Sequence, residues 1–400
     1  MNKDNFLHKK KFIAIYVLDV IFKNLFRLST LVGFPRKRKF NTNKVLFIEP
    51  AHLGDALLTT PAIKFLKENR EELKINCLVS PEGKVGLINN RNIESIYTID
   101  LPWYKTNVKY NIAAQFFSFY KLIKLLRQIN PQIAINVRNT SYHREHLAVW
   151  LAGIPERIGY GHKGFAYLLT TAAPFSKAKQ TAQLKLDVIS YWLRIGANGY
   201  SLRPDYFYEL NDVAKAKHIL EQIGIDKKEK ELIIAVNPGA QHNFLWEIEY
   251  YVELCNLINY KLGAKIIFTG TKNFVEYIDK IQEELSFQIF SIAGMTTLEE
   301  AAALLNMFDL LITVDTGLRY IASAVGLKTI VLKHGADSIT EFGKHVETET
   351  LVIKNVDCSP CGKSVCPLKI MVCMEGITPQ MVFQEVKKLL KEEHQFHDEE

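Results

Sequence analysis

Residues 44–66, KVLFIEPAHLGDALLTTPAIKFL, pass from an apolar run through a short glycine-containing turn into an amphipathic run. The pattern predicts a buried strand over 44–49, a turn at 52–54, and a helix that carries Asp55 near its start. Open α/β sheets bind ligands at the carboxyl ends of their strands, where such turns lie. The stretch therefore predicts an α/β fold and places one carboxylate at a candidate binding site.

The same alternation of short apolar runs with helix-length segments recurs in two blocks. The runs lie at 44–49, 74–79, 95–99 and 132–137 in the first block, and at 231–236, 265–269, 288–292, 310–314, 329–332 and 350–353 in the second. Strands separated by helices form parallel sheets with helices on both faces. We therefore predict two doubly wound, Rossmann-like α/β domains that face each other.

Three segments follow from this pattern. They are an amphipathic basic extension over 1–43, a first α/β domain over 44–205, and a second over 206–400 that contains a cysteine cluster. The join is expected within 196–210, where Gly and Pro interrupt the helical periodicity. Helical patterns are clearest over 113–128 and over 378–393, where Thr378-Pro379 provides a cap and first-turn pair.

The extension carries much of the chain's net charge of +7. Basic runs at 9–11 and 36–39 flank an apolar run at 12–34, in which Asp19, Lys23 and Arg27 share one helical face. A narrow charged stripe on a broad apolar helix is typical of a helix that lies in a membrane interface. The alternative is a helix packed on the protein's own surface. Since no cleavage signal follows, we expect a cytoplasmic protein, peripheral on the inner membrane.

Asp55 is the candidate catalytic residue. A carboxylate beside the amides of a helix N-terminus is stabilised in its ionised form and can accept a proton. The alternative is an N-cap aspartate whose function is confined to holding the end of the helix. Position alone leaves both interpretations open.

Two further strand-to-helix turns predict a phosphate-binding site. Asp-Thr-Gly at 315–317 follows the run 310–314, and Asn-Pro-Gly-Ala at 237–240 follows the run 231–236. Glycine lets a ligand approach the backbone, and the exposed amides of such turns suit a phosphate. Taken singly, each turn is equally compatible with ordinary helix capping or an ordinary βα loop.

Together and in this order, the three turns resemble those of the heptosyltransferases of glycosyltransferase family 9. The similarity covers about 44–386 and rests on LGDALLTTPAIKFLK, RIGY, NPGA before a Trp-led helix, DTGLRYIASAVGLKTIVL and CSPCGKSVCPLKIMVCMEGI. The resemblance implies the two-domain B-type glycosyltransferase architecture (GT-B). It also implies inverting transfer of a sugar, with heptose from ADP-heptose favoured, to the inner core of lipopolysaccharide.

The resemblance also implies roles for individual residues. Asp55 would be the general base, without a metal or other cofactor, so helix amides and basic side chains would neutralise the leaving diphosphate. The candidate donor-binding residues are Asn237, Gly239, Ala240, Asp315, Thr316, Gly317, Arg319 and Lys333. The candidate acceptor-binding residues are Gly54, Arg138 and Arg144, although the two arginines are equally compatible with a solvated surface. The implied partners are a nucleotide-sugar donor, a lipid-linked saccharide acceptor and the inner-membrane surface, and no nucleic acid is expected.

The chain departs from the family pattern on the donor side. Phe244 stands where the family has a lysine, Tyr320 stands where it has a histidine, and 333–335 reads Lys-His-Gly instead of Phe-Gly. We predict that Lys333 or Arg319 replaces the missing lysine, and His334 and Lys272 are further sources of positive charge. These departures leave open a different nucleotide sugar, or a relative that binds sugar nucleotides without turnover.

Four cysteines lie close together near the C-terminus, at Cys358, Cys361, Cys366 and Cys373. Their spacing fits one tetrahedral zinc ion, but only one CxxC pair is present where the usual signature has two. Reduced structural thiols are therefore the favoured interpretation, with zinc as the alternative.

Overall fold

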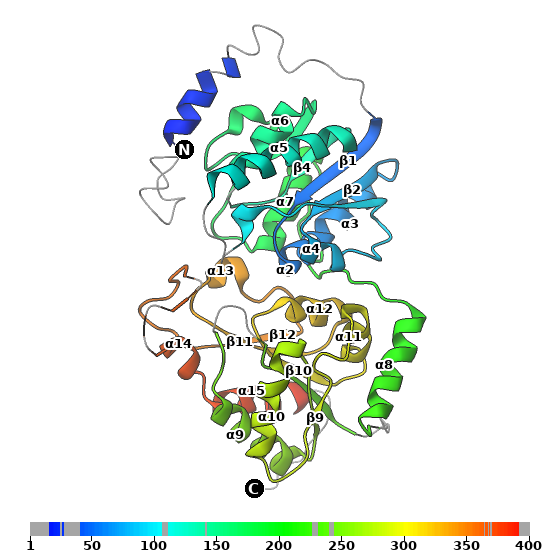
Figure 1. The fold of residues 1–400 in the computed structure, drawn as a ribbon, viewed down its shortest axis with the longest axis vertical. Helices are drawn as coiled ribbons and strands as arrows, with labels where there is room; N and C mark the ends of the chain where they lie inside the picture. The colour runs from blue at the N-terminus through cyan, green and yellow to red at the C-terminus, as the bar shows by residue number, and fades with distance from the viewer. Residues whose placement is uncertain are drawn as a thin grey trace. The chain divides into compact units, whose positions relative to one another are not determined.

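The protein, seen here as a computed structural model, divides into two compact α/β units, Met1–Leu202 and Arg203–Glu400 (Figure 1). This boundary lies within the expected range 196–210 and three residues before the predicted one between residues 205 and 206. The structure describes residues 16–24, 26–27, 41–105, 111–140, 142–225, 231–239, 244–363, 365–366, 368 and 370–391.

The first unit is built on a six-stranded parallel sheet with the order β3-β2-β1-β4-β5-β6. Its strands are β1 (Asn41–Glu49), β2 (Lys74–Val79), β3 (Ser95–Thr98), β4 (Pro131–Asn136), β5 (Glu156–Tyr160) and β6 (Thr171–Ala173). The strand order reverses between β1 and β4, and ligands of such sheets bind at that switch point. The turn that carries Asp55 follows β1 and therefore lies there.

The second unit repeats this topology. Its parallel sheet has the order β12-β11-β10-β7-β8-β9, so the order reverses between β7 and β10. The strands are β7 (Ile233–Asn237), β8 (Lys265–Phe268), β9 (Phe290–Ser291), β10 (Leu310–Val314), β11 (Thr329–Lys333) and β12 (Glu349–Ile353). Both predicted turns of the phosphate site, after β7 and after β10, flank this second switch point. The predicted pair of doubly wound domains is confirmed.

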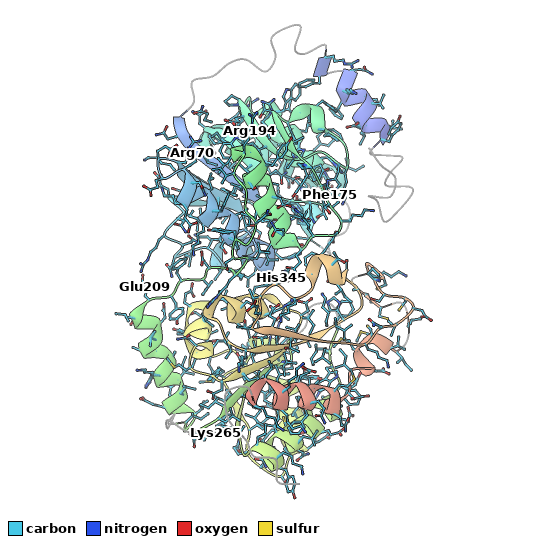
Figure 2. The ribbon with its side chains drawn as sticks, turned by 180° about the vertical axis from the view of Figure 1, so that it is seen from behind. Arg70, Phe175, Arg194, Glu209, Lys265 and His345 are labelled. Atoms are coloured by element: carbon cyan, nitrogen blue, oxygen red, sulfur yellow. The ribbon has the colours of Figure 1, made fainter. Side chains whose placement is uncertain are left out.

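Helices cover both faces of each sheet. The first unit contains α2 (Leu53–Leu57), α3 (Thr60–Asn69), α4 (Pro81–Val85), α5 (Ile112–Ile129), α6 (His143–Leu151) and α7 (Thr181–Leu193), with the 3-10 turns η2 (Pro102–Tyr104) and η3 (Ala166–Leu168). The second contains α8 (Leu210–Gln222), α9 (Ile248–Leu262), α10 (Val275–Glu283), α11 (Leu298–Leu305), α12 (Gly317–Val325), α13 (Ile339–Phe342), α14 (Val372–Glu375), α15 (Pro379–Lys391) and η4 (Lys272–Phe274). Glu209, labelled in Figure 2, caps the start of α8 through a capping box.

The apolar strands are explained by burial on both faces. Along β1, Val45 and Phe47 pack in one cluster with α3 and α7, whereas Leu46 and Ile48 pack in another with α5 and α6. Side chains alternate between faces along a strand, so a strand covered on both sides needs apolar residues at nearly every position. This is why the short continuous runs predicted the strands well.

Residues 16–24 and 26–27 are helical and pack against the first unit. The backbone amide of Phe165 donates to Asp19 Oδ1 at 2.5 Å, and the Phe26 ring lies 5.6 Å from that of Trp150. The alternative of a helix packed on the protein's own surface is thus observed. The opposite face exposes Val17 and Ile21 among others. No helix among the described residues has the length and apolarity needed to cross a membrane.

Candidate active site

Asp55 lies in the first turn of α2, beyond the carboxyl end of β1. The N-cap position of this helix belongs to His52, whose backbone is extended (φ −82°, ψ 169°). Asp55 is therefore not the N-cap residue itself. The residue is half-buried, and its carboxylate accepts a hydrogen bond from the backbone amide of His52, so it helps to close the start of α2.

A buried ion-pair cluster contacts this turn and holds it in place. Glu49, the last residue of β1, pairs with Arg138 and with Lys185, and the side chains of Glu49 and Lys185 are each 2% exposed. Lys185 Nζ also donates to the backbone carbonyl of Asp55 at 2.7 Å and to Thr59 Oγ1 at 3.0 Å. The cluster thus ties β1, the segment after β4 and α7 to the turn that presents Asp55.

The same cations act on the charge of Asp55. Burial alone would raise the pKa of Asp55, but the positive charges of Arg138 and Lys185 outweigh it, with a smaller contribution from His52. The pKa of the Asp55 carboxyl therefore lies below its ordinary value of 3.8. The carboxylate is ionised at neutral pH and can accept a proton.

Two of these residues were not among the predicted site residues. Glu49 ends an apolar strand, and Lys185 lies within the apolar helical segment TAQLKLDVIS. A charged residue inside an otherwise buried face is the signal that was available, because burying a charge is costly unless it is paired. Neither position belongs to a recognisable motif.

The two predicted acceptor arginines lie in different environments. Arg138 is 10% exposed, is paired with Glu49, and its guanidinium carbon lies 4.5 Å from the ring centre of Tyr104 in η2. Arg144 is exposed and lies 4.7 Å from the ring centre of Trp103. Arg138 therefore acts mainly within the cluster beneath Asp55, whereas Arg144 is accessible to a ligand. Gly54 directly precedes Asp55 in α2.

In the second unit, Asn237 joins the two turns that flank the switch point. Its Nδ2 donates to Thr313 Oγ1 at 3.0 Å and to Thr316 Oγ1 at 3.2 Å, and its Oδ1 accepts from the amide of Gly239 at 3.2 Å. The structure thus brings together the predicted residues after β7 and after β10. Ala240 lies outside the described residues.

Asp315 is held by two buried cations. It pairs with Lys333, the last residue of β11, and with Arg319 at 3.1 Å, and both cationic side chains are 0% exposed. Burial alone would raise the pKa of Asp315, but Lys333 and then Arg319 outweigh it and hold that pKa well below its ordinary value. Asp315 is therefore a fixed anion of the turn.

Arg319 has no N–H group left for a donor phosphate. A guanidinium has five N–H donors, and those of Arg319 bond to both oxygens of Glu349, to Asp315, and to the carbonyls of Phe342 and Gly343. A direct contact between Arg319 and the donor would require one of these bonds to break. This corrects the expectation that Arg319 replaces the family's lysine: it positions Asp315 and Glu349 instead.

The network around Glu349 extends to neighbouring elements. Ser323 Oγ of α12 donates to Glu349 Oε1 at 2.8 Å, and the amide of His345, labelled in Figure 2, donates to Oε2 at 3.0 Å. Burial alone would raise the pKa of Glu349, but its bonds to Arg319 outweigh this and lower it. The first turn of α12 is thereby fixed to the start of β12.

Aromatic packing occupies the positions that depart from the family. The ring of Phe244 stacks on that of His334 at 4.1 Å and an interplanar angle of 16°. Tyr320 is 7% exposed and lies 5.4 Å from the ring of His345. Lys272, in contrast, is exposed in η4, and its loop adjoins the turn after β7, since a Cβ on Gly270 would lie 3.6 Å from Asn237 Oδ1.

In the described part of the chain, the thiols of the four clustered cysteines are not gathered into one group of ligands. Among the residues that the structure describes, the single group of three or more metal-ligating atoms within 4.8 Å of one another is Asp315, His334 and Asp337. Lys333 Nζ is already bonded to Asp315 and lies 3.7 Å from Asp337. A cation therefore already neutralises these carboxylates, and the group does not suit a metal ion.

Comparison with known proteins agrees with this geometry. The profile of glycosyltransferase family 9 (heptosyltransferase) matches residues 119–372. Lipooligosaccharide heptosyltransferase 2 of Campylobacter jejuni is 24% identical over 290 residues, which cover 69% of this chain and 89% of the relative.

Solved structures support the same architecture. A family 9 glycosyltransferase of Veillonella parvula superposes with a TM-score of 0.70 at 19% identity, over 89% of this chain and 99% of that one. ADP-heptose LPS heptosyltransferase II of Escherichia coli superposes with a TM-score of 0.66 at 19% identity, over 88% and 100%. The expected GT-B fold is thus confirmed.

Proposed function

This chain belongs to glycosyltransferase family 9, and from that premise we propose that it transfers heptose from ADP-heptose to the inner core of lipopolysaccharide. The names of its relatives favour this donor and this acceptor. The family match begins at residue 119 and so does not include Asp55. The role of Asp55 therefore rests on its own geometry.

Asp55 is the general base of the proposed reaction, and the observation that carries the proposal is its ionised, half-buried carboxylate beside the cluster of Glu49, Arg138 and Lys185. The carboxylate takes the proton of the acceptor hydroxyl. That oxygen attacks the anomeric carbon from the side opposite the leaving group, so the configuration inverts. The bond between the anomeric carbon and the donor phosphate breaks, and the nucleoside diphosphate leaves with the electron pair.

The donor diphosphate is bound in the second unit. The turn at 315–317 supplies backbone amides, and Asn237 holds that turn to the one after β7. All five N–H groups of Arg319 are already hydrogen-bonded within the protein. The exposed Lys272 is therefore the better source of mobile positive charge for the diphosphate, with Lys333 as the buried alternative. Neutralisation by amides and one lysine stabilises the leaving diphosphate.

The direct test is a product assay with ADP-heptose and a lipopolysaccharide acceptor truncated at the inner core. The expected product is the acceptor plus one heptose, with inverted anomeric configuration determined by NMR. No product with ADP-heptose, but product with another nucleotide sugar, would redirect the assignment of the donor.

That second candidate has one observation in its favour. The ring of Phe244, stacked on that of His334, stands where the resemblance leads one to expect a lysine. The contacts to the donor at this position therefore differ from those of the family. Thermal shift against a panel of ADP-, GDP- and UDP-sugars separates the two candidates, since the true donor stabilises the folded state in proportion to its affinity. The third possibility, an inactive relative, is disfavoured by the ionised Asp55.

The proposed site of action is the cytoplasmic face of the inner membrane. Among the helical residues 16–24 and 26–27, the side chains of Val17, Leu18 and Ile21 are each between 46% and 49% exposed. Such exposed apolar side chains suit the boundary between headgroups and acyl chains. A V17S/I21S variant tests this through its binding to vesicles.

A further inference from the structure

The first half of α5 carries an aromatic face that the packing of the first unit does not use. None of residues 112–121 is buried, whereas Leu122, Leu126 and Ile129 in the second half pack on the sheet. The exposed fractions of its apolar side chains are 64% for Ile112, 74% for Phe116, 59% for Phe117 and 62% for Tyr120. Large exposed apolar patches of this kind mark interaction surfaces.

The charges of α5 indicate what this surface contacts. The helix contains Lys121, Lys124 and Arg127 and no acidic residue. Lys121 Nζ lies 4.5 Å from the centre of the Phe117 ring, so the cation sits directly beside the aromatic face. Aromatic side chains with flanking lysines are typical of the boundary between a bilayer and water, where anionic headgroups attract the cations.

We propose that Ile112, Phe116, Phe117 and Tyr120 enter the headgroup region of an anionic bilayer, with Lys121 and Lys124 on lipid phosphates. This surface lies on α5 and shares no residue with the helical residues 16–24 and 26–27. Amphipathic segments that lie in an interface combine an apolar face with a cationic border in this way. The absence of any carboxylate on α5 disfavours a basic partner, and no acidic protein partner is needed to explain the lysines.

The position of α5 suggests how this contact serves the reaction. This step rests on the proposed function, in which the acceptor is lipid-linked. The helix packs against η2 and against α6, and α6 lies beside it in Figure 1. Trp103 and Tyr104 of η2 stack on Arg144 and Arg138. The membrane surface therefore adjoins the candidate acceptor residues, so a lipid-linked saccharide reaches them without leaving the bilayer.

The test is co-sedimentation of the full-length protein with vesicles of phosphatidylethanolamine and phosphatidylglycerol, compared with vesicles of phosphatidylcholine. An F116S/F117S variant should bind the anionic vesicles about tenfold more weakly, because two phenyl groups no longer leave water. K121E/K124E should lose the preference for anionic vesicles. The matched control is Tyr260→Ser, since Tyr260 is 82% exposed and also has a lysine, Lys261, at 5.0 Å from its ring centre.

Unchanged vesicle binding of both α5 variants would overturn the proposal. A loss of self-association in F116S/F117S with vesicle binding intact would also overturn it, in favour of an interface with a second copy. Transfer to a delipidated, water-soluble acceptor separates this inference from the proposed function. The α5 variants should transfer to it at the wild-type rate, whereas a wild-type protein without transfer activity would refute the function and leave the vesicle result standing.

Discussion

The two sheets share one strand order, and each holds a buried carboxylate between two cations at the carboxyl end of a central strand. The two units differ in which carboxylate is ion-paired with the cations. In the first unit it is Glu49 of the strand, so the half-buried Asp55 of the turn stays outside the ion pairs. In the second unit it is Asp315 of the turn itself. The same arrangement therefore leaves the carboxylate of the turn outside the ion pairs in the first unit, where we propose that it accepts a proton, and holds it within them in the second unit, where we propose that the turn binds the donor.

The strongest test of this comparison is Asp55→Asn. The amide keeps the shape of the side chain but cannot accept the proton, so kcat should fall by about 10²–10⁴-fold. Affinity for the donor should not change, because the donor residues lie in the second unit. Steady-state kinetics and calorimetric titration of ADP-heptose measure the two quantities.

Asp315→Asn is the matched variant in the second unit. Because Asp315 holds the turn through Lys333 and Arg319, its amide should weaken donor binding and lower stability. If Asp315→Asn instead lowered kcat alone, as Asp55→Asn is expected to do, the distinction between the two carboxylates would be lost.

Glu349→Gln should give the next largest effect, on stability. The change leaves the fully buried Arg319 without its bidentate partner, and breaking such a pair costs about 3–5 kcal/mol. The loss should fall near the lower end because Asp315 remains. Urea unfolding followed by circular dichroism measures it, with Glu347→Gln as the control.

Much of the fold was readable from the sequence for a physical reason. Strands buried on both faces form short continuous apolar runs, and the run at 74–79 coincides with β2. The three-residue β6 was missed, since Thr-Ala-Ala at 171–173 is too short to show any period. The starts of β12 and α9 differ from the predicted ones by one or two residues, as helix and strand ends commonly do.

The site was readable only where a motif marked it. Asp55 and the turn at 315–317 follow strands in recognisable contexts, and the structure places both at switch points. Glu49 and Lys185 are 136 residues apart, and nothing local signals that they pair. The full use of Arg319 by five acceptors is likewise a property of tertiary packing.

Lys185→Met probes how the first cluster sets the charge of Asp55. A general base works in its ionised form, so if Asp55 is the base, as we propose, kcat/KM falls when the pH drops through the pKa of Asp55. Removing Lys185 removes one charge that lowers this pKa. The acidic limb of the pH profile should therefore move to higher pH.

A merely structural role of Lys185 would lower stability without moving that limb. Lys179→Met is the control, because Lys179 forms an exposed pair with Asp187 on the same unit and is not among the charges that act on Asp55. An unshifted limb in Lys185→Met would mean that Arg138 and His52, without Lys185, set the charge of Asp55.

Lys272→Ala should give the smallest effect, a weaker affinity for ADP, and tests which lysine of the second unit contacts the diphosphate. Lys333 is buried against Asp315, whereas Lys272 is exposed beside the turn after β7, so only Lys272 keeps a mobile charge for the diphosphate. One exposed charge contact contributes about 1 kcal/mol, so the Kd for ADP should rise about fivefold. Titration calorimetry at two salt concentrations measures this, with the exposed Lys261→Ala as control. An unchanged Kd would leave Lys333 as the cation that meets the donor, and the second cluster would then bind ligand as well as hold its turn.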